Sequence, residues 1–119
     1  MNSYQELQVW QKSIGMVEEI YRVTKSYPKD ELYGIISQTR RAAVSIPANI
    51  AEGYARKHRQ EYIQFLRIAF GSGAELETHL IIAKRLQLAP ILQVEKSQKM
   101  LDEIMRMLNG LINSLVAKP

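Results

Sequence analysis

The chain has 119 residues and a formal charge of +4 at neutral pH, with 46% hydrophobic and 24% charged residues. This composition is typical of a soluble globular domain and argues against collagen-like, low-complexity or disordered chains. There is no cysteine, so neither a disulfide framework nor a thiol nucleophile is available. The apolar runs are too short to cross a membrane, and the polar start lacks the pattern of a secretory signal. We therefore expect one cytoplasmic domain over residues 1–119.

Apolar residues recur every three or four positions along four segments, which is the pattern of amphipathic helices. In the first segment one helical face carries Leu7, Trp10, Ile14, Val17 and Tyr21. Pro28 and Pro90 interrupt the pattern and mark turns. We predict helices over about residues 5–25, 29–55, 60–88 and 92–116. Because the connections are short and no β-like alternation occurs, the predicted fold class is all-α, an antiparallel up-and-down four-helix bundle.

Pro47 lies inside the second predicted helix, where it removes a backbone donor and crowds the carbonyl of Ala43. We therefore predict that this helix is kinked near Pro47. Two short helices with a break near Ser45 are the alternative, and the sequence alone does not choose between them.

Gly71 and Gly73 fall in the middle of the third predicted helix, where each costs about 1 kcal/mol relative to alanine. Close approach by a neighbouring helix would explain both glycines. We expect that neighbour to be the small-residue segment formed by Ala42, Ala43 and Ala48.

Further apolar residues lie beside or off the main stripes of the predicted helices. They exceed what a monomeric bundle of this size must bury, so either the stripes are wide or a second surface packs against another subunit. We favour self-association, because homo-oligomers are common and the excess occurs on several helices. These residues are Ile20, Val23, Ile63, Phe70, Ile81, Ile82, Met100, Met107 and Ile112.

The chain offers few groups for catalysis or metal binding. Its two histidines are His58, in a basic connection, and His79, in the third predicted helix. A dinuclear metal site in a helical bundle needs four carboxylates and two Glu-x-x-His motifs, and the nearest pair here is Glu75 with His79 at i, i+4. The sequence offers no Gly-rich phosphate-binding loop, because its paired glycines lie within a helical pattern and not after a strand. We predict no metal, no cofactor and no enzymatic activity.

A polar stripe runs alongside the apolar one in the second predicted helix. We expect Arg41 to reach Glu75, and Ser45 or Asn49 to supply hydrogen bonds near Pro47. The stripe is then a structural seam, which is costly unless it is fully paired, and an exposed binding stripe is the alternative. The predicted seam consists of Gln38, Arg41, Ser45, Asn49, Glu52 and Glu75.

Positive charge is concentrated at two places in the chain. Arg56, Lys57 and Arg59 lie in the connection before the third predicted helix, and Lys84 and Arg85 lie near its end. In an up-and-down bundle these are opposite ends, so they form two separate candidate nucleic-acid sites. Clusters of this size are more often solvated turns. An oligomer would change that balance, because it repeats each cluster and its phosphate contacts add up.

Four groups of motifs carry a resemblance to a known family. They are Leu7–Gln11 (LQVWQ), Tyr27–Pro28 with Glu31–Gly34 (ELYG), Arg40–Gly53 (RRAAVSIPANIAEG), and Ala69–Ser72 (AFGS) with Glu75–Thr78 (ELET). Together they resemble the four-helix-bundle family that is also called the ribosomal RNA intervening-sequence protein family. The match covers about residues 4 to 90, and the last predicted helix carries no signature.

The resemblance implies a left-handed antiparallel four-helix bundle that assembles into a homopentameric ring, in a bacterial family whose biochemical role is not established. Two positions depart from the family's pattern. His58 stands where a serine or threonine often caps the third helix, so we expect that helix to start late or fray. Gln87 stands where a glycine usually ends it, which leaves the terminating turn open.

These observations lead to two hypotheses of different kinds. The first is a non-enzymatic, homo-oligomeric helical scaffold that binds structured RNA through phosphate contacts at the basic residues named above, without base specificity. The second is an adaptor that binds another protein through apolar surfaces and binds no nucleic acid. The two differ in the salt dependence of binding, which is steep for phosphate contacts.

Overall fold

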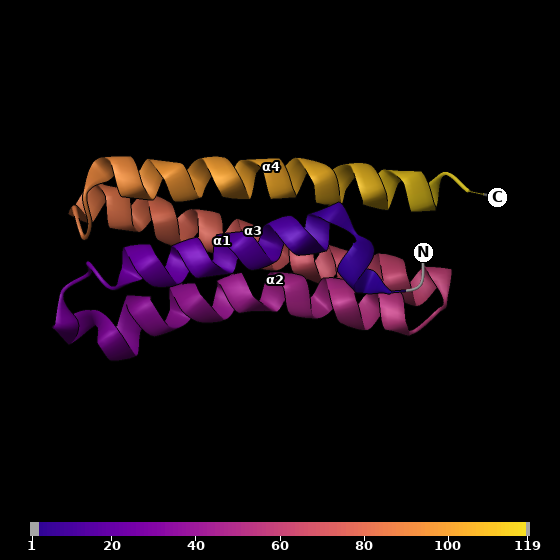
Figure 1. The fold of residues 1–119 in the computed structure, drawn as a ribbon, viewed down its shortest axis with the longest axis horizontal. Helices are drawn as coiled ribbons and strands as arrows, with labels where there is room; N and C mark the ends of the chain where they lie inside the picture. The colour runs from indigo at the N-terminus through magenta and orange to yellow at the C-terminus, as the bar shows by residue number, and fades with distance from the viewer. Residues whose placement is uncertain (1–2, 119) are drawn as a thin grey trace.

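The computed structural model describes residues 3–118, and this part of the chain forms four long helices with short helical turns before the first two (Figure 1). It contains no strand, which confirms the all-α fold class. The long helices are α1 (Gln8–Thr24), α2 (Ser37–Ala55), α3 (Arg59–Leu86) and α4 (Ile91–Val116). The short turns are η1 (Tyr4–Glu6), η2 (Lys29–Glu31) and η3 (Leu32–Ile36).

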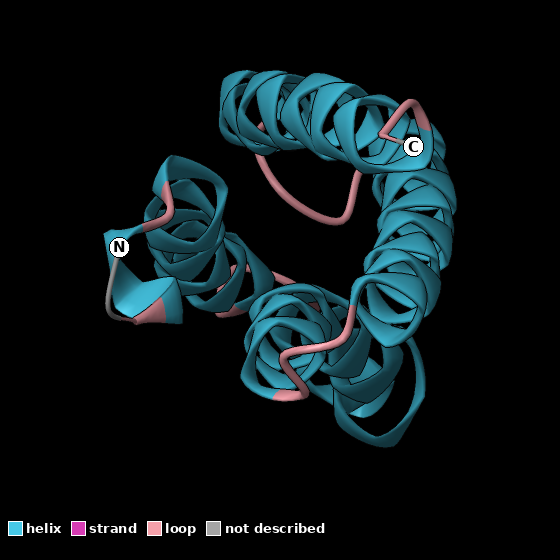
Figure 2. Ribbon diagram, turned by 90° about the vertical axis from the view of Figure 1, so that its right-hand side faces the viewer, coloured by secondary structure: helices cyan, strands magenta, loops and turns pink. Residues whose placement is uncertain are grey.

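The four helices form an elongated bundle 48 Å long, in which each helix packs on the next and α4 returns to pack on α1 (Figure 2). The chain reverses direction at each of its three connections (Figure 1). The α2–α3 connection and the C-terminal end of α4 therefore lie at one end of the bundle, called the α2–α3 end below. The other two connections lie at the opposite end.

Helix α2 continues without a break from Ser37 to Ala55 and passes through Pro47, which is buried. The alternative of two short helices with a break near Ser45 is therefore wrong. The backbone leaves helical geometry earlier, at Gly34 in the π-helical turn η3, where φ is −112° and ψ is −113°. The segment predicted as one helix over 29–55 is thus divided near its start, ahead of the apolar stripe of α2.

Helix α1 turns a different face to the core than its regular apolar stripe suggests. The apolar side chains that it buries completely or nearly so are Val9, Met16, Ile20 and Val23. The stripe from Leu7 to Tyr21 lies at the edge of the core, and the side chains of Ile14 and Tyr21 remain 37% and 39% exposed. Helix α1 therefore carries one wide apolar surface, whose outer edge at Ile14 and Tyr21 is only partly covered within the chain.

The glycines of α3 do not face the alanines of α2. A Cβ atom on Gly73 would meet the end of the Met105 side chain of α4, so this glycine faces α4 and lies directly against that flexible side chain. A Cβ atom on Gly71 would meet nothing within 4 Å. The expected contact with Ala42, Ala43 and Ala48 is wrong, because α2 packs on a different side of α3.

Both ends of α3 are regular, although His58 and Gln87 depart from the family's pattern there. The helix begins at Arg59, directly after His58, although the His58 side chain makes no capping hydrogen bond. At the other end Gln87 adopts the left-handed conformation, with φ 56° and ψ 44°. The Gln87 amide donates to the Lys84 carbonyl and the Leu88 amide to the Ala83 carbonyl, which completes a Schellman motif. Gln87 thus takes the conformation that usually belongs to glycine.

Replacing this residue tests the terminating turn. The Gln87→Gly variant is expected to raise the free energy of unfolding by about 1 kcal/mol, because glycine adopts the left-handed conformation without a steric penalty from Cβ. Urea denaturation at fixed protein concentration measures the change. The control is Leu86→Gly in the last helical turn, which should lower stability by a similar amount. A destabilised Gln87→Gly variant would contradict the assignment of this turn.

Candidate nucleic-acid interface

The basic residues at the α2–α3 end are placed by a tight turn between two helices. Helix α2 ends at Ala55, and Lys57 then adopts the left-handed conformation with φ 57°, which reverses the chain within three residues. Arg56, Lys57 and Arg59 are all exposed at this turn. They come together because the turn is short, as the sequence suggests.

The three cations differ in what they bind within the chain. The guanidinium of Arg56 lies 3.4 Å from a carboxylate oxygen of Glu52 and 3.6 Å from one of Glu61, and it also stacks over the ring of Phe65. Arg59 donates from Nη1 to the carbonyl of Lys118 at 2.7 Å. Lys57 forms no ion pair with any residue of 3–118, so its charge faces solvent.

An open hollow of about 510 Å³ lies next to these cations, between the start of α3 and the end of α4. The rings of Tyr54 and Tyr62 meet edge to face in its wall, with centroids 5.8 Å apart. Proteins that bind single-stranded nucleic acids combine cations, which contact the phosphates, with aromatic rings, on which the bases stack. The hollow is lined by Tyr54, Lys57, His58, Arg59, Tyr62, Leu115 and Lys118.

Sequence reasoning missed the two tyrosines and Lys118. Tyr62 has the spacing of a core residue, and Lys118 is separated from the cluster by 59 residues. The only sequence signal for the tyrosines is their position on either side of the basic connection.

The second predicted cluster, Lys84 and Arg85, lies at the opposite end of the bundle from Arg56, Lys57 and Arg59. Lys84 pairs with Glu95 of α4 at 3.0 Å, so much of its charge is balanced locally. Arg85 is exposed and forms no ion pair among the described residues. One unpaired cation of this predicted cluster remains, so Lys84 and Arg85 are the weaker candidate for phosphate binding.

The predicted polar seam is divided into separate groups. Ser45 bonds to Ser72 of α3 at 2.8 Å, and Asn49 donates to both the carbonyl and the hydroxyl of Ser45. This group joins α2 to α3. Gln38 and Arg41 are exposed and take no part in it.

The expected contact between Arg41 and Glu75 does not form. The Glu75 carboxylate instead lies 3.8 Å from Nε2 of His79, four residues further along α3. The Glu52 carboxylate is directed to Arg56, as described above. The predicted seam therefore consists of a central hydrogen-bonded group and two separate local pairs. These pairs are Glu52 with Arg56 and Glu75 with His79.

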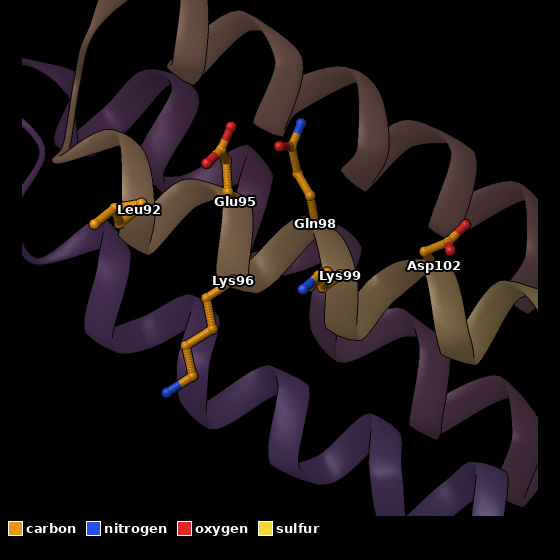
Figure 3. A pocket seen from close by; sticks show the side chains of 6 residues that line it. All are labelled: Leu92, Glu95, Lys96, Gln98, Lys99 and Asp102. Atoms are coloured by element: carbon orange, nitrogen blue, oxygen red, sulfur yellow. The ribbon is translucent and has the colours of Figure 1, made fainter.

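No arrangement of residues suited to metal binding occurs in the part of the chain that the structure describes. No group of three or more His, Cys, Asp or Glu side chains there could hold a metal ion. Another open hollow lies along α4 alone, where Glu95 and Gln98 point away from Lys96 (Figure 3). Because these side chains do not converge, the hollow has no evident ligand chemistry.

Among residues 3–118, no helix combines the length and apolar character that crossing a bilayer requires.

Comparison with known proteins places the fold in a family. The family model described as 23S rRNA-intervening sequence protein matches residues 5–110 of the chain, and the chain belongs to this family. A solved structure from Bacteroides thetaiotaomicron is 27% identical, with a TM-score of 0.80 over 87% of this chain and 97% of that one. It is described as a protein of unknown function from the S23 ribosomal protein family. No match was found among curated proteins.

Two tyrosines of the bundle should make its stability depend on alkaline pH. Burial raises the pKa of Tyr27 to about 12, and burial together with the nearby Tyr54 raises the pKa of Tyr62 to about 12. In the unfolded chain both should titrate near 10. The neutral phenol is thus favoured by folding, so this contribution is complete below about pH 10 and is lost as the pH rises toward 12.

We expect the double variant Tyr27→Phe with Tyr62→Phe to lose less stability than the wild type between these pH values. Urea denaturation across the alkaline range measures the difference. The matched control is Tyr33→Phe, because the Tyr33 side chain is 94% exposed and should leave the profile unchanged. Identical profiles for the double variant and the wild type would contradict the prediction.

Proposed function

We propose that the protein is a cytoplasmic, non-enzymatic, homo-oligomeric scaffold that binds structured RNA through phosphate contacts at its α2–α3 end. The observation that carries this proposal is the hollow that Lys57, Arg59 and Lys118 line together with Tyr54 and Tyr62. Lysine and arginine neutralise phosphates, and tyrosine rings stack on unpaired bases. The family name points to ribosomal RNA as the first RNA to use as a probe.

Oligomerisation is part of the proposal because the α2–α3 end of one copy carries too few cations to bind RNA tightly. A ring of five copies, as the family resemblance implies, would present the same cluster five times to one RNA. Each added phosphate contact steepens the dependence of affinity on salt, and linked contacts raise the overall avidity. Exposed apolar side chains on α1 and α3 support association of the chain with itself.

The RNA proposal is tested by reversing the cluster's charge. In the variant Arg56→Glu, Lys57→Glu, Arg59→Glu, binding to a 23S ribosomal RNA fragment is expected to fall at least tenfold at moderate salt, because phosphate neutralisation is lost. Fluorescence anisotropy measures the affinity, and circular dichroism should show unchanged helix content. The slope of log affinity against log salt should also become shallower than in the wild type.

A variant away from the α2–α3 end provides the charge-matched control. The changes Lys25→Glu, Lys99→Glu and Arg106→Glu alter the net charge equally, and all three residues are exposed. RNA affinity should stay closer to that of the wild type in this variant than in the cluster variant. Equal losses in both variants would mean that binding follows net charge alone, and retained affinity in the cluster variant would refute the site.

The alternative function is a protein-interaction adaptor without nucleic-acid binding. It is favoured by the same exposed apolar side chains, for example Phe70 and Ile81 of α3. A wild-type protein that shows no salt-dependent affinity for RNA would leave this alternative as the better account.

A further inference from the structure

The outer surfaces of the four helices differ sharply in character. Helix α4 presents Lys96, Lys99, Asp102, Glu103 and Arg106 to solvent, as a surface helix normally does. Helices α1 and α3 instead leave large apolar side chains uncovered in the middle of the bundle. These two surfaces are unusual because isolated exposed apolar residues are common but continuous rows are not.

The first surface is a row on α1, called the α1 ridge and consisting of Leu7, Trp10, Ile14, Val17 and Tyr21. Consecutive members are three or four residues apart, so the row is continuous along one side of the helix. Met16, Ile20 and Val23 lie on the adjoining side of α1 and are buried in the core, and Leu7, Trp10 and Val17 of the ridge pack partly against it. Ile14 and Tyr21 form the outer edge of this wide apolar surface and remain 37% and 39% exposed.

Helix α2 borders the α1 ridge with small side chains. The guanidinium of Arg40 lies 4.5 Å from the ring centroid of Tyr21, which fixes the register of the two antiparallel helices. One turn further along α2 lies Val44, which is 42% exposed, followed on the same side by Ala48 and Ala51. The side chains that follow Arg40 on this side of α2 are thus one valine and two alanines.

The second surface is the α3 outer face, which consists of Ile68, Phe70, Gly71, Ala74, Ile81 and Ile82. All six are exposed, and the four large side chains are 36–46% exposed. Helical spacing places Gly71 and Ala74 in a lane between Phe70 and Ile81 on one side and Ile68 and Ile82 on the other. Between Arg67 and Ile82 the charged residues of α3 are Arg67, Glu75 and Glu77, all of them exposed.

The two surfaces match in length and lie on opposite sides of the molecule. Leu7 to Tyr21 and Ile68 to Ile82 each cover fourteen helical steps, or about 21 Å. Helices α1 and α3 are diagonal in the bundle, because each packs on both α2 and α4 (Figure 2). One molecule therefore carries a ridge of large side chains and, on its far side, a lane of small ones with apolar walls.

We propose that the α1 ridge of one copy packs on the α3 outer face of a second copy, so that copies associate through two different surfaces. This inference rests on the self-association in the proposed function and names the surfaces that make it. A ridge of large side chains fits a lane that contains glycine, because the missing Cβ lets two helices approach closely. Gly71 has no neighbour in its own chain that would require a glycine. A contact of this heterologous kind closes into a ring or continues as a chain of copies.

The test uses one variant on each surface. Ile14→Glu blocks the α1 ridge and Phe70→Glu blocks the α3 outer face, and both side chains are exposed enough for the fold to survive. Each variant alone should be monomeric by size-exclusion chromatography with light scattering, whereas the wild type is oligomeric. Mixed at equal concentration, the two should form a 1:1 dimer and nothing larger, because one intact ridge and one intact lane remain. Lys99→Glu on α4 is the control and should keep the wild-type mass.

Each other outcome overturns the proposal. A monomeric wild type would show that no second copy binds either surface, and a different protein would then have to cover them. A Phe70→Glu variant with wild-type mass shows that the α3 outer face is not used. Two monomeric variants that never combine show that the contact is not heterologous. If the wild type is oligomeric and both variants keep its mass, these surfaces are wrong while self-association and RNA binding still stand.

A second readout uses Gly71, whose substitution separates folding from assembly. In the monomeric Ile14→Glu background, Gly71→Ala should raise the thermal unfolding midpoint, because alanine favours the helix and its Cβ meets open space. In the otherwise wild-type chain the same change should raise the dissociation constant of the oligomer. An unchanged dissociation constant would contradict the placement of the α1 ridge over Gly71.

Discussion

The close approach of α2 to α3 at Gly53 is the constraint on which the rest of the bundle depends. A Cβ atom at this position would lie 2.7 Å from Cβ of Phe65 and 3.3 Å from the carbonyl oxygen of Tyr62. Because α2 and α3 meet this closely just before the chain reverses, the connection must be short. The same contact brings the rings of Tyr54 and Tyr62 together and holds the basic residues at the end of the bundle. Further along the interface, the hydrogen bond between Ser45 and Ser72 joins the two helices again.

The positions of the helices could be predicted closely from the sequence, and the face of α1 could not. Pro28 and Pro90 mark real turns, and the four long periodic segments are all helical. Periodicity shows that a face is apolar, but it does not say what covers that face. The core face of α1 is hidden from such reasoning because it contains polar residues, namely Ser13, Glu19 and Thr24.

These polar residues are tolerated in the core because their partners are local or lie at its edge. The hydroxyl of Ser13 donates to the Trp10 carbonyl and that of Thr24 to the Ile20 carbonyl. The carboxylate of Glu19 is paired with Arg22 at 2.8 Å and with Lys96 of α4 at 3.6 Å. A buried polar group costs little once it is bonded, so a helix face with three such residues can still be the inner one.

The candidate site was predicted in place but not in detail. The sequence locates Arg56, Lys57 and Arg59 in one turn, because they are neighbours in the chain. It does not show that Arg59 binds the carbonyl of Lys118, since that contact depends on how α4 packs. The same reason explains the missing contact between Arg41 and Glu75, two residues whose separation is set by the rotation of α2 and α3 about their axes.

The proposed function assigns separate tasks to the sides and the ends of this bundle, and within it the way in which the sides associate decides what the ends can do. If two copies met through identical faces across a two-fold axis perpendicular to the helices, their α2–α3 ends would point in opposite directions. In a ring built from two different faces about an axis along the helices, all α2–α3 ends lie on one rim. The proposed function needs this second arrangement, because in it the basic clusters of all copies would contact one RNA and their phosphate contacts would add.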